Sequence, residues 1–388
     1  MLRKEMLQLF KLKSEEINMF DGNRIMLLIT ENCNLNCVYC YEHKKNNSNM
    51  SFQTAKDILD KHLSQAELKI PIVIELFGGE AFCNFTLIKQ IDDYIQSNYG
   101  YLNITYETTT NGTLVHGEIQ EWLYEHKDKF FIALSLDGIK QMHDKNRVFL
   151  NGTGTFDSID IEFFANTWQR CPAKMTVSEK TLPQLAEGII YLDRLGFKCD
   201  ATLSVGVDWD LEKNIPILIR ELNKLVEYYT ENSESQLCTM LNMDFRLIFS
   251  PIDENYRFCG AGIDMTCYDS QGNAYPCQGF APVSIGKEAD HYQNFDHSKF
   301  CFTKDNICKG CQWIRLCSNC YAANFQSTGN IQIVDSSLCQ FYKMCILTSA
   351  KIQCIRILQK TVKSYDDQLV LKAVSTVQNI LGESYASN

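Results

Sequence analysis

The chain has 388 residues, 45% hydrophobic and 22% charged, which is typical of a globular protein of two or three domains with a sizeable core. Its net charge of −10 argues against a nucleic-acid surface, for which a basic patch is the expected footprint, and is compatible with a basic peptide partner. No apolar run reaches the roughly 18 to 20 residues that span a bilayer, and residues 1–16 lack a signal peptide's apolar core and cleavage site. The sequence therefore predicts a cytoplasmic protein that does not bind a membrane.

Short β-branched or aromatic runs alternate with helical patterns between residues 25 and 230, which indicates β/α repeats. The expected strands are 25–30, 72–77, 103–109, 130–136, 173–178 and 201–206. The expected helices are 52–65 (with Ser51 as cap), 85–97, 115–125, 157–167, 184–195 (ended by Gly196) and 211–230. Six such repeats with right-handed crossovers close a parallel sheet only partway. The predicted fold class is α/β: a partial (β/α)6 barrel with a lateral mouth, followed by a Cys-rich domain and a helical tail.

Three cysteines, Cys33, Cys37 and Cys40, follow the first expected strand directly, where such a barrel places its site. Thiols of a reducing compartment stay free, and clustered ones often bind metal. Three thiolates at this spacing can hold three irons of a [4Fe–4S] cluster and leave the fourth iron open for a ligand. A zinc loop or a set of buried thiols is the alternative interpretation.

The loop resembles the CxxxCxφC signature of the radical S-adenosylmethionine (SAM) superfamily, with Tyr39 at the aromatic position φ. The resemblance implies that the open iron chelates SAM, and that reductive cleavage of SAM yields a 5′-deoxyadenosyl radical that abstracts hydrogen from the substrate. It also implies an external electron donor of the flavodoxin or ferredoxin type. Because such clusters are oxygen-labile, we expect an anaerobic or low-oxygen cell.

Gly78, Gly79 and Glu80 end the second expected strand. Glycines at a strand end let the backbone approach a ligand, and Glu80 is placed to accept from an ammonium, whereas a tight turn with a solvated Glu is the alternative. The stretch resembles the superfamily's GGE motif, which binds the SAM amino group. It departs from many relatives at Ala81, where they have Pro.

The third expected strand ends near Asn111 and the fourth near Ser135 and Asp137, either of which is also compatible with simple turn chemistry. The segment 135–157 resembles peptide-modifying members of the superfamily, in which a Ser and an Arg matching Ser135 and Arg147 contact the SAM carboxylate. Asp137 is a candidate for binding ribose or substrate. His143 is expected to be structural.

The stretch from residue 250 to residue 345 is dense in Cys and contains Gly, and it predicts a second domain that needs metal to order it. The run Cys308-x2-Cys311-x5-Cys317-x2-Cys320 is compatible with a zinc site of four cysteines, although its central gap is short. The wider arrangement, with Cys259, Gly272, Cys277 and Cys339, resembles the SPASM domain, which binds two auxiliary [4Fe–4S] clusters.

The resemblance to SPASM domains implies one set of ligands for each auxiliary cluster. The first set is Cys259, Cys267, Cys277 and Cys320, and the second is Cys308, Cys311, Cys317 and Cys339. Two residues separate the last two cysteines of the run, where the common spacing has three, which weakens the assignment of Cys320. Some relatives leave the position of Cys267 open for substrate.

The predicted organisation is an N-terminal segment (1–23), a radical SAM barrel (24–235), a SPASM domain (250–345) and a tail of amphipathic helices (346–388). Only 32 residues precede Cys33. Recognition of a leader peptide is therefore expected to use the barrel, the Cys-rich domain or a separate leader-binding protein.

Relatives with a SPASM domain mostly modify ribosomally synthesised precursor peptides or proteins. A thioether or carbon–carbon crosslink is the favoured reaction, because auxiliary clusters can accept the surplus electrons of an oxidative step. Epimerisation stays open, with Cys83 as a candidate hydrogen donor, although Cys often serves as a small hydrophobe.

Formylglycine formation, as in anaerobic sulfatase maturation, is disfavoured. That subfamily carries an Asp after the Cys matching Cys277, whereas Gln278 stands here and cannot act as a base. A non-enzymatic electron carrier or sensor would need the same cysteines but not Glu80, Ser135 and Arg147.

Overall fold

The computed structural model describes residues 23–207, 209–250, 259–263, 265–293, 308, 311, 313–317 and 319–386. Nearly all of the predicted N-terminal segment 1–23 lies outside these ranges, as do parts of the predicted SPASM domain. Among the described residues, no helix is both long enough and apolar enough to cross a bilayer.

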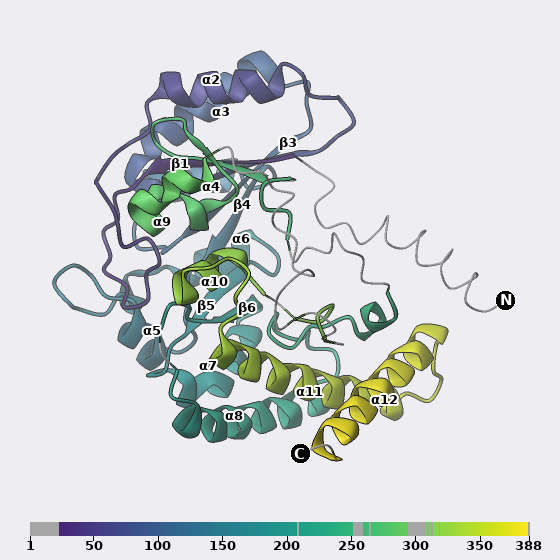
Figure 1. The fold of residues 1–388 in the computed structure, drawn as a ribbon. Helices are drawn as coiled ribbons and strands as arrows, with labels where there is room; N and C mark the ends of the chain where they lie inside the picture. Colours follow the sequence, from purple (N-terminus) through teal and green to yellow (C-terminus); the bar gives the residue numbers. More distant parts are fainter. Residues whose placement is uncertain are drawn as a thin grey trace.

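One eight-stranded sheet organises the described residues, in the order β6-β5-β4-β3-β2-β1-β7-β8 (Figure 1). The strands from β1 to β6 pair in parallel with their sequence neighbours, which confirms the predicted partial barrel. Their bounds are β1 (Asn23–Thr30), β2 (Ile72–Gly78), β3 (Ile104–Thr110), β4 (Phe130–Leu134), β5 (Pro172–Val177), β6 (Lys198–Leu203), β7 (Met265–Tyr268) and β8 (Ala274–Tyr275). The sixth strand starts three residues earlier than predicted, because its polar start alternates with buried Cys199 and Ala201.

Helices connect the strands and continue beyond them, with bounds α2 (Phe52–Leu63), α3 (Phe85–Tyr99), α4 (Glu118–Glu125), α5 (Lys140–Asn146), α6 (Ile161–Thr167), α7 (Leu185–Arg194), α8 (Leu211–Glu231), α9 (Pro282–Ile285), α10 (Tyr321–Thr328), α11 (Ser336–Gln359) and α12 (Tyr365–Ala386). Ser51 caps α2 by accepting from the Thr54 N–H at 3.0 Å, as predicted. Gly196, at φ +83°, follows α7. The sequence did not predict α5, because KQMHDKN has no apolar periodicity.

The two faces of the strands differ in burial. Leu76 and Ile132 point toward the helices and are 0% and 2% exposed. The opposite side of the same internal strands carries Phe131, which is 47% exposed, and the exposed Thr109. Internal strands of parallel sheets are normally covered on both faces. The exposure of Phe131 and Thr109 therefore shows that the concave face of this barrel is open along β3 and β4.

The Cys-rich region joins the barrel sheet. Its strand β7 pairs in parallel with β1, where Cys267 lies opposite Met26, and β8 returns antiparallel to β7. An apolar cluster shared by Met26 and Leu28 with Tyr275, Phe280 and other residues covers the concave side of β1. The predicted second domain therefore packs against the barrel through a continuous sheet.

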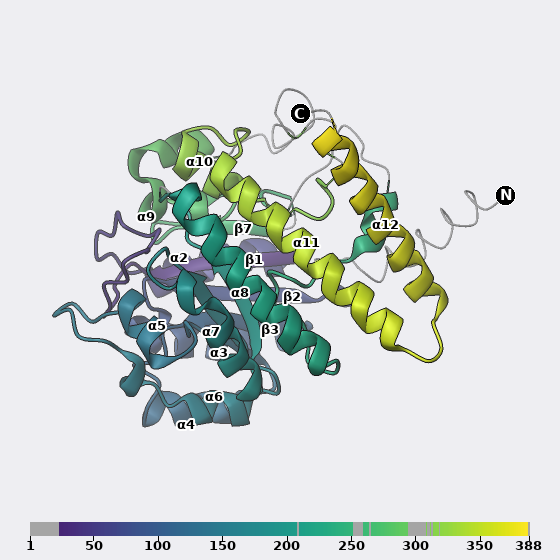
Figure 2. The ribbon, with the colours of Figure 1, turned by 90° about the horizontal axis from the view of Figure 1, so that it is seen from below.

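The predicted C-terminal helices are present. Figure 2 shows α11 lying along α8, with α12 beside the distal half of α11. Phe341 of α11 packs edge-on against Trp209 at 5.0 Å between ring centres, and the Ser349 hydroxyl donates to the Leu241 carbonyl at 2.6 Å. The predicted boundary at residue 346 falls inside α11, which also carries Cys339 and Cys345.

Candidate functional site

The loop that carries Cys33, Cys37 and Cys40 rests on the carboxyl end of β2. The Gly79 N–H donates to the Thr30 carbonyl at 3.1 Å, and the Glu80 N–H donates to the Asn32 carbonyl at 2.8 Å. A Cβ atom on Gly79 would lie 2.6 Å from the Asn32 oxygen, and one on Gly78 would lie 2.0 Å from the Thr30 oxygen. The close approach that requires glycine here is to the backbone of this loop, and contact of the two glycines with a cofactor stays a prediction.

The three loop cysteines are half-buried and free of disulfide bonds. Burial raises the pKa of Cys33 to about 12, against an opposing effect of Lys45, and it also raises the pKa of Cys37, against an opposing effect of Arg147. Cys37 acts electrostatically on Cys33, and Cys40 on Cys37, so the three thiols are neighbours. Cluster ligation therefore requires that Cys33 and Cys37 lose their protons on binding iron.

A site for a single metal ion and a site for a [4Fe–4S] cluster place different demands on the ligand geometry. Among the described residues, no three His, Cys, Asp or Glu side chains converge closely enough to hold one ion. The thiolates of a [4Fe–4S] cluster each contact a separate iron, so they need not converge on one point.

Glu80 is a buried carboxylate surrounded by neutral donors. Its side chain is 2% exposed and accepts from the Asn111 N–H at 2.7 Å, the Thr110 hydroxyl at 2.8 Å and the Phe82 N–H at 3.2 Å. Burial raises the pKa of Glu80, whereas its hydrogen bonds and the charge of Arg147 act in the opposite direction. Its hydrogen-bond partners among the described residues are all neutral. A buried carboxylate with no directly bonded cation is costly, so a ligand ammonium would fit this position.

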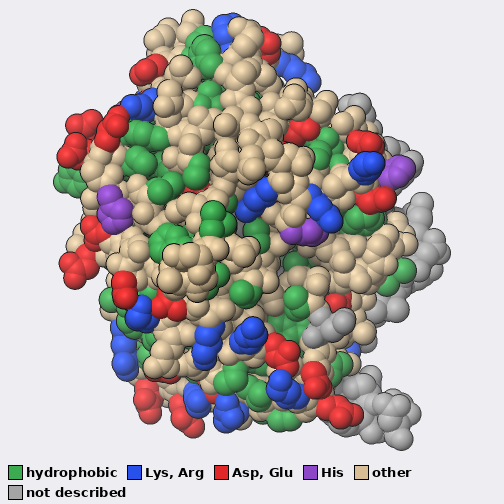
Figure 3. Space-filling view, turned by 90° about the vertical axis from the view of Figure 1, so that its left-hand side faces the viewer, with side chains coloured by type: hydrophobic (Ala, Val, Ile, Leu, Met, Phe, Trp, Pro, Cys, Tyr) green, Lys and Arg blue, Asp and Glu red, His purple; other side chains and the backbone are tan. Residues whose placement is uncertain are grey.

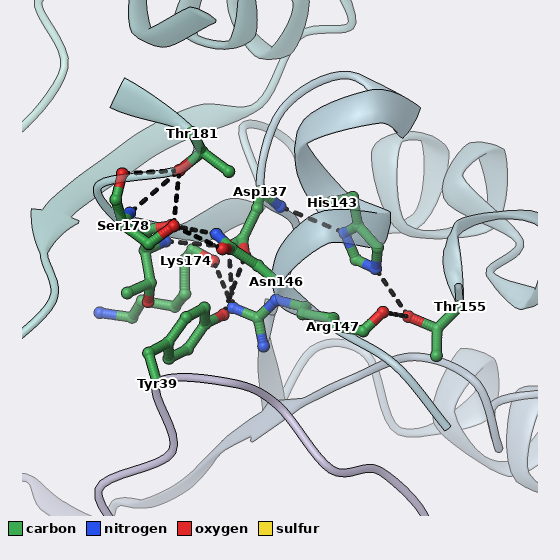
Figure 4. Close-up of polar contacts among 10 residues, drawn as sticks. Tyr39, Asp137, His143, Asn146, Arg147, Thr155, Lys174, Ser178 and Thr181 are labelled. Atoms are coloured by element: carbon green, nitrogen blue, oxygen red, sulfur yellow. Dashed lines mark hydrogen bonds and ion pairs between the residues drawn. The ribbon is translucent and has the colours of Figure 1, made fainter. Parts of the chain in front are cut away.

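Asp137 connects four segments of the chain (Figure 4). It is 0% exposed and accepts from the Tyr39 hydroxyl at 2.9 Å, Asn146 Nδ2 at 3.1 Å, Arg147 Nη2 at 3.0 Å and the Thr176 N–H at 2.9 Å. Each carboxylate oxygen accepts twice, so protein donors fill this side chain. Asp137 therefore holds Tyr39 and Arg147 in place, and its contact with ribose or substrate stays a prediction.

Arg147 has donor capacity left over. The residue is 6% exposed, its guanidinium carbon lies 5.3 Å from the centre of the Tyr39 ring, and Nη2 donates to the Lys174 carbonyl at 3.2 Å. Burial opposes its charge, but Asp137 holds the pKa of Arg147 above its usual value. Nε is buried and has no partner among the described atoms. The neighbouring Ser135 is 8% exposed, and no hydrogen bond of its hydroxyl is found within the described ranges. These two side chains fit a ligand carboxylate.

One residue that the sequence did not single out ties the Cys loop to the rest of the site. Asn34, inside the Cys loop, donates to the Thr113 hydroxyl at 2.8 Å and accepts from Asn111 Nδ2 at 3.0 Å, which ties the loop to the end of β3. The sequence signal that could have pointed to Asn34 is its position between Cys33 and Cys37.

His143 is structural, as predicted: Nδ1 accepts from the Asp137 N–H at 3.3 Å, and Nε2 lies 2.9 Å from the Thr155 hydroxyl.

The cysteines of the second region lie in two groups. Cys277 has Cys320 and Cys259 as electrostatic neighbours, and Cys267 has Cys277. The other group is Cys317 with Cys339, Cys308 and Cys311. Burial raises the pKa of Cys317 to about 12 and that of Cys308 to about 11. The groups coincide with the two predicted ligand sets, whose role in binding clusters stays a prediction.

Cys83 is exposed and lies in the 3-10 helix η1 (Ala81–Asn84), next to Glu80. Burial of part of the thiol raises its pKa, and Glu80 acts in the same direction. The group is therefore a protonated thiol near neutral pH, which is the form that a hydrogen donor requires.

Side chains of both charges are interspersed along the lower part of the face in Figure 3.

Comparisons with known proteins agree with this geometry. The Radical SAM superfamily model matches residues 27–159. The chain is 35% identical over 235 residues to the uncharacterized protein MJ0907 of Methanocaldococcus jannaschii, which covers 56% of this chain and 77% of that protein. The chain belongs to the radical SAM superfamily and is an enzyme of its SPASM-type maturase group. The superfamily's cofactors, SAM and a [4Fe–4S] cluster, are the groups that this site would hold.

Characterised relatives are more distant. The radical SAM cyclopropyl synthase TigE of Paramaledivibacter caminithermalis is 22% identical over 356 residues, or 83% of this chain and 72% of that protein. A cysteine-type anaerobic sulfatase-maturating enzyme of Clostridium perfringens is 22% identical over 342 residues, or 80% of this chain and 91% of that protein. The solved structure of native anSMEcpe with bound AdoMet and Cp18Cys peptide has a TM-score of 0.64 at 20% identity, over 83% of this chain and 95% of that one, and this likeness concerns the fold alone.

Proposed function

We propose that this enzyme modifies a ribosomally synthesised precursor peptide by radical chemistry. Cys33, Cys37 and Cys40 would hold the SAM-binding cluster, which supplies the electron that cleaves SAM. Glu80 would accept from the SAM amino group, and Ser135 and Arg147 would donate to its carboxylate. The observation that carries this proposal is the unused polar capacity beside the Cys loop. Among the described residues, the buried Glu80 carboxylate is bonded by neutral donors only, and one buried guanidinium nitrogen of Arg147 has no partner.

The open concave face supports a substrate as large as a peptide. Phe131 and Thr109 project from internal strands, and their exposure leaves room beneath the strand ends where the Cys loop lies. On the same face, Arg24 Nη1 is shared by Glu75 at 2.7 Å and Glu107 at 2.6 Å, so two carboxylates face one guanidinium. This surplus negative charge suits a peptide that is not acidic.

We favour a thioether or carbon–carbon crosslink as the product, with two auxiliary clusters in the SPASM region accepting electrons. A cyclopropyl synthase among the relatives agrees with bond formation within a peptide. Epimerisation with Cys83 as hydrogen donor is the second candidate, because that thiol is exposed next to Glu80. Formylglycine formation stays disfavoured by Gln278, although a sulfatase-maturating enzyme is among the relatives. The electron donor and any leader-binding protein would be separate chains.

The test is anaerobic reconstitution, followed by iron and sulfide counts and a SAM-cleavage assay with dithionite. We expect about twelve irons for three [4Fe–4S] clusters, and about four fewer after replacing Cys33, Cys37 and Cys40 together by Ala. Only the wild type should form 5′-deoxyadenosine. A fully loaded wild type that does not cleave SAM would contradict the proposal and favour an electron carrier.

The residues proposed to bind SAM, which are Glu80, Ser135 and Arg147, need their own variants. Glu80→Gln and Arg147→Met should weaken SAM binding while leaving the iron content at the wild-type value, because neither residue is a proposed iron ligand. Phe131→Asp is the matched control on the concave face: it should leave SAM binding intact and impair modification of a candidate peptide. Unchanged SAM affinity in both Glu80→Gln and Arg147→Met would contradict the proposed role of these two residues in binding SAM.

A further inference from the structure

Lys45 lies among the three cysteines of the Cys loop. Its Nζ is 3.7 Å from Cys40 Sγ, within reach of an N–H···S hydrogen bond, and the side chain is half-buried. Cys33 and Cys37 are also electrostatic neighbours of this ammonium. A lysine ammonium is a cation at neutral pH, because its ordinary pKa is about 10.4.

The backbone on both sides of Lys45 is fixed. The Lys44 N–H donates to the Val283 carbonyl at 3.0 Å, and the Asn46 N–H donates to Glu31 Oε2 at 2.5 Å. Glu31 is itself 5% exposed, so this anchor is buried. Because the backbone on both sides is held in this way, pointing the side chain at Cys40 costs the rotamer entropy of Lys45 but little further ordering of the backbone.

We propose that Lys45 raises the reduction potential of the SAM-binding cluster by donating to the sulfur of Cys40 and by placing a positive charge next to all three ligands. Hydrogen bonds to ligand sulfurs and the net charge around a cluster are among the features that set its potential. When the cluster accepts one electron from an external reductant, its negative charge grows by one and no bond forms or breaks. A fixed ammonium stabilises the reduced form more than the oxidised form, and so favours this step.

This inference rests on the proposed role of Cys33, Cys37 and Cys40 as cluster ligands. The sequence offers a matched control, because Lys44 is the adjacent residue with the same charge and is exposed. Lys45→Met and Lys44→Met therefore remove the same charge from neighbouring positions, and only the first also removes the contact with Cys40. Lys45→Arg keeps the charge and an N–H donor.

The experiment is a redox titration of the reconstituted full chain with dithionite, followed by electron paramagnetic resonance. The variant with Cys33, Cys37 and Cys40 replaced by Ala gives the signal of any other clusters, which is subtracted. We expect Lys45→Met to make reduction of the SAM-binding cluster about tenfold less favourable, which is a shift of about 59 mV to more negative potential for one electron. Lys44→Met should match the wild type, and Lys45→Arg should recover most of the shift.

An intact cluster whose potential is unchanged in Lys45→Met overturns the inference, as does an equal shift in Lys44→Met. If Lys45→Met takes up less iron than the wild type, the comparison passes to Lys45→Gln and Lys45→Arg, which both keep a donor and differ in charge. Equal potentials in that pair would overturn the electrostatic part of the inference. A wild type with no SAM-responsive signal would instead refute the proposed function, so the two failures are distinguishable.

Discussion

The contact between Asp137 and Arg147 allows a sharp test of how the site is built. Asp137→Asn removes the carboxylate that pairs with Arg147, a residue that is only 6% exposed. An amide nitrogen in the place of Oδ2 would be a donor that faces both the Tyr39 hydroxyl and Asn146 Nδ2. Breaking a buried pair by removing one partner costs about 3–5 kcal/mol. Arg147→Met should cost less, about 1–3 kcal/mol, because Asp137 keeps its other three donors.

A double-mutant cycle on these two residues isolates their coupling. The double variant removes both charges, so we expect its loss in free energy of unfolding to be smaller than the sum of the single losses by about 1–3 kcal/mol. Urea unfolding of the anaerobically reconstituted chain, followed by far-ultraviolet circular dichroism, measures all four species. Additive losses would refute the ion pair as the reason for the burial of Arg147.

The same four proteins separate two roles for Asp137. If Asp137 acts on SAM only by holding Arg147, then Asp137→Asn weakens SAM binding in the wild type and has no further effect in the Arg147→Met background. If Asp137 contacts the ribose, as the sequence suggested, the two effects on the dissociation constant multiply. Equilibrium dialysis of SAM against the reconstituted proteins distinguishes these outcomes.

Three further changes test other parts of the structure. Gly79→Ala should lower iron uptake by the Cys loop, because the new Cβ would lie 2.6 Å from the Asn32 carbonyl, and an iron count equal to that of the wild type would contradict this. Burial lowers the pKa of His143 to about 4, so its stabilising effect is complete above the unfolded pKa of about 6.5 and is lost as the pH falls toward 4. His143→Gln should therefore flatten the fall in melting temperature between pH 7 and pH 5, and an unchanged slope would refute this. Leu28→Ala and Leu27→Ala should each cost about 2–5 kcal/mol, but only Leu28→Ala should speed amide exchange in β7, because Leu28 faces the core shared with the Cys-rich region.

The sequence predicted the barrel well because its signals are local. All six strands and most of the connecting helices follow from runs of apolar residues and from caps such as Ser51. By contrast, β7 is four residues long and reads MTCY, which has no distinctive periodicity. Its partner β1 lies about 240 residues earlier, and pairing across such a separation depends on the packing of the whole Cys-rich region.

The site shows the same division between local and distant information. The Cys spacing and the sequence GGE are contiguous, so the sequence singled out Cys33 and Glu80 directly. The partners of Asp137 come from the Cys loop, α5 and β5, and no spacing in the chain indicates that they meet. Lys45 lies in the polar stretch KKNN, and no feature of the sequence distinguishes it from Lys44. The difference between the two lysines becomes visible only in the structure, where the Lys44 N–H bonds to Val283 and the Asn46 N–H to Glu31.

The cations around the Cys loop are placed to stabilise negative charge on the cysteines. The loop is held between two cations, since Lys45 contacts Cys40 and Arg147 acts on Cys37, and Arg147 is itself held by Asp137. Thiolates and an added electron both increase negative charge, and both are favoured by cations that do not have to move. Glu80 carries the opposite charge, and its hydrogen-bond partners among the described residues are neutral. A zwitterionic ligand would therefore fit both groups: its ammonium would give Glu80 a directly bonded cation, and its carboxylate would accept from Arg147 Nε, which has no partner among the described atoms although Nη2 is paired with Asp137.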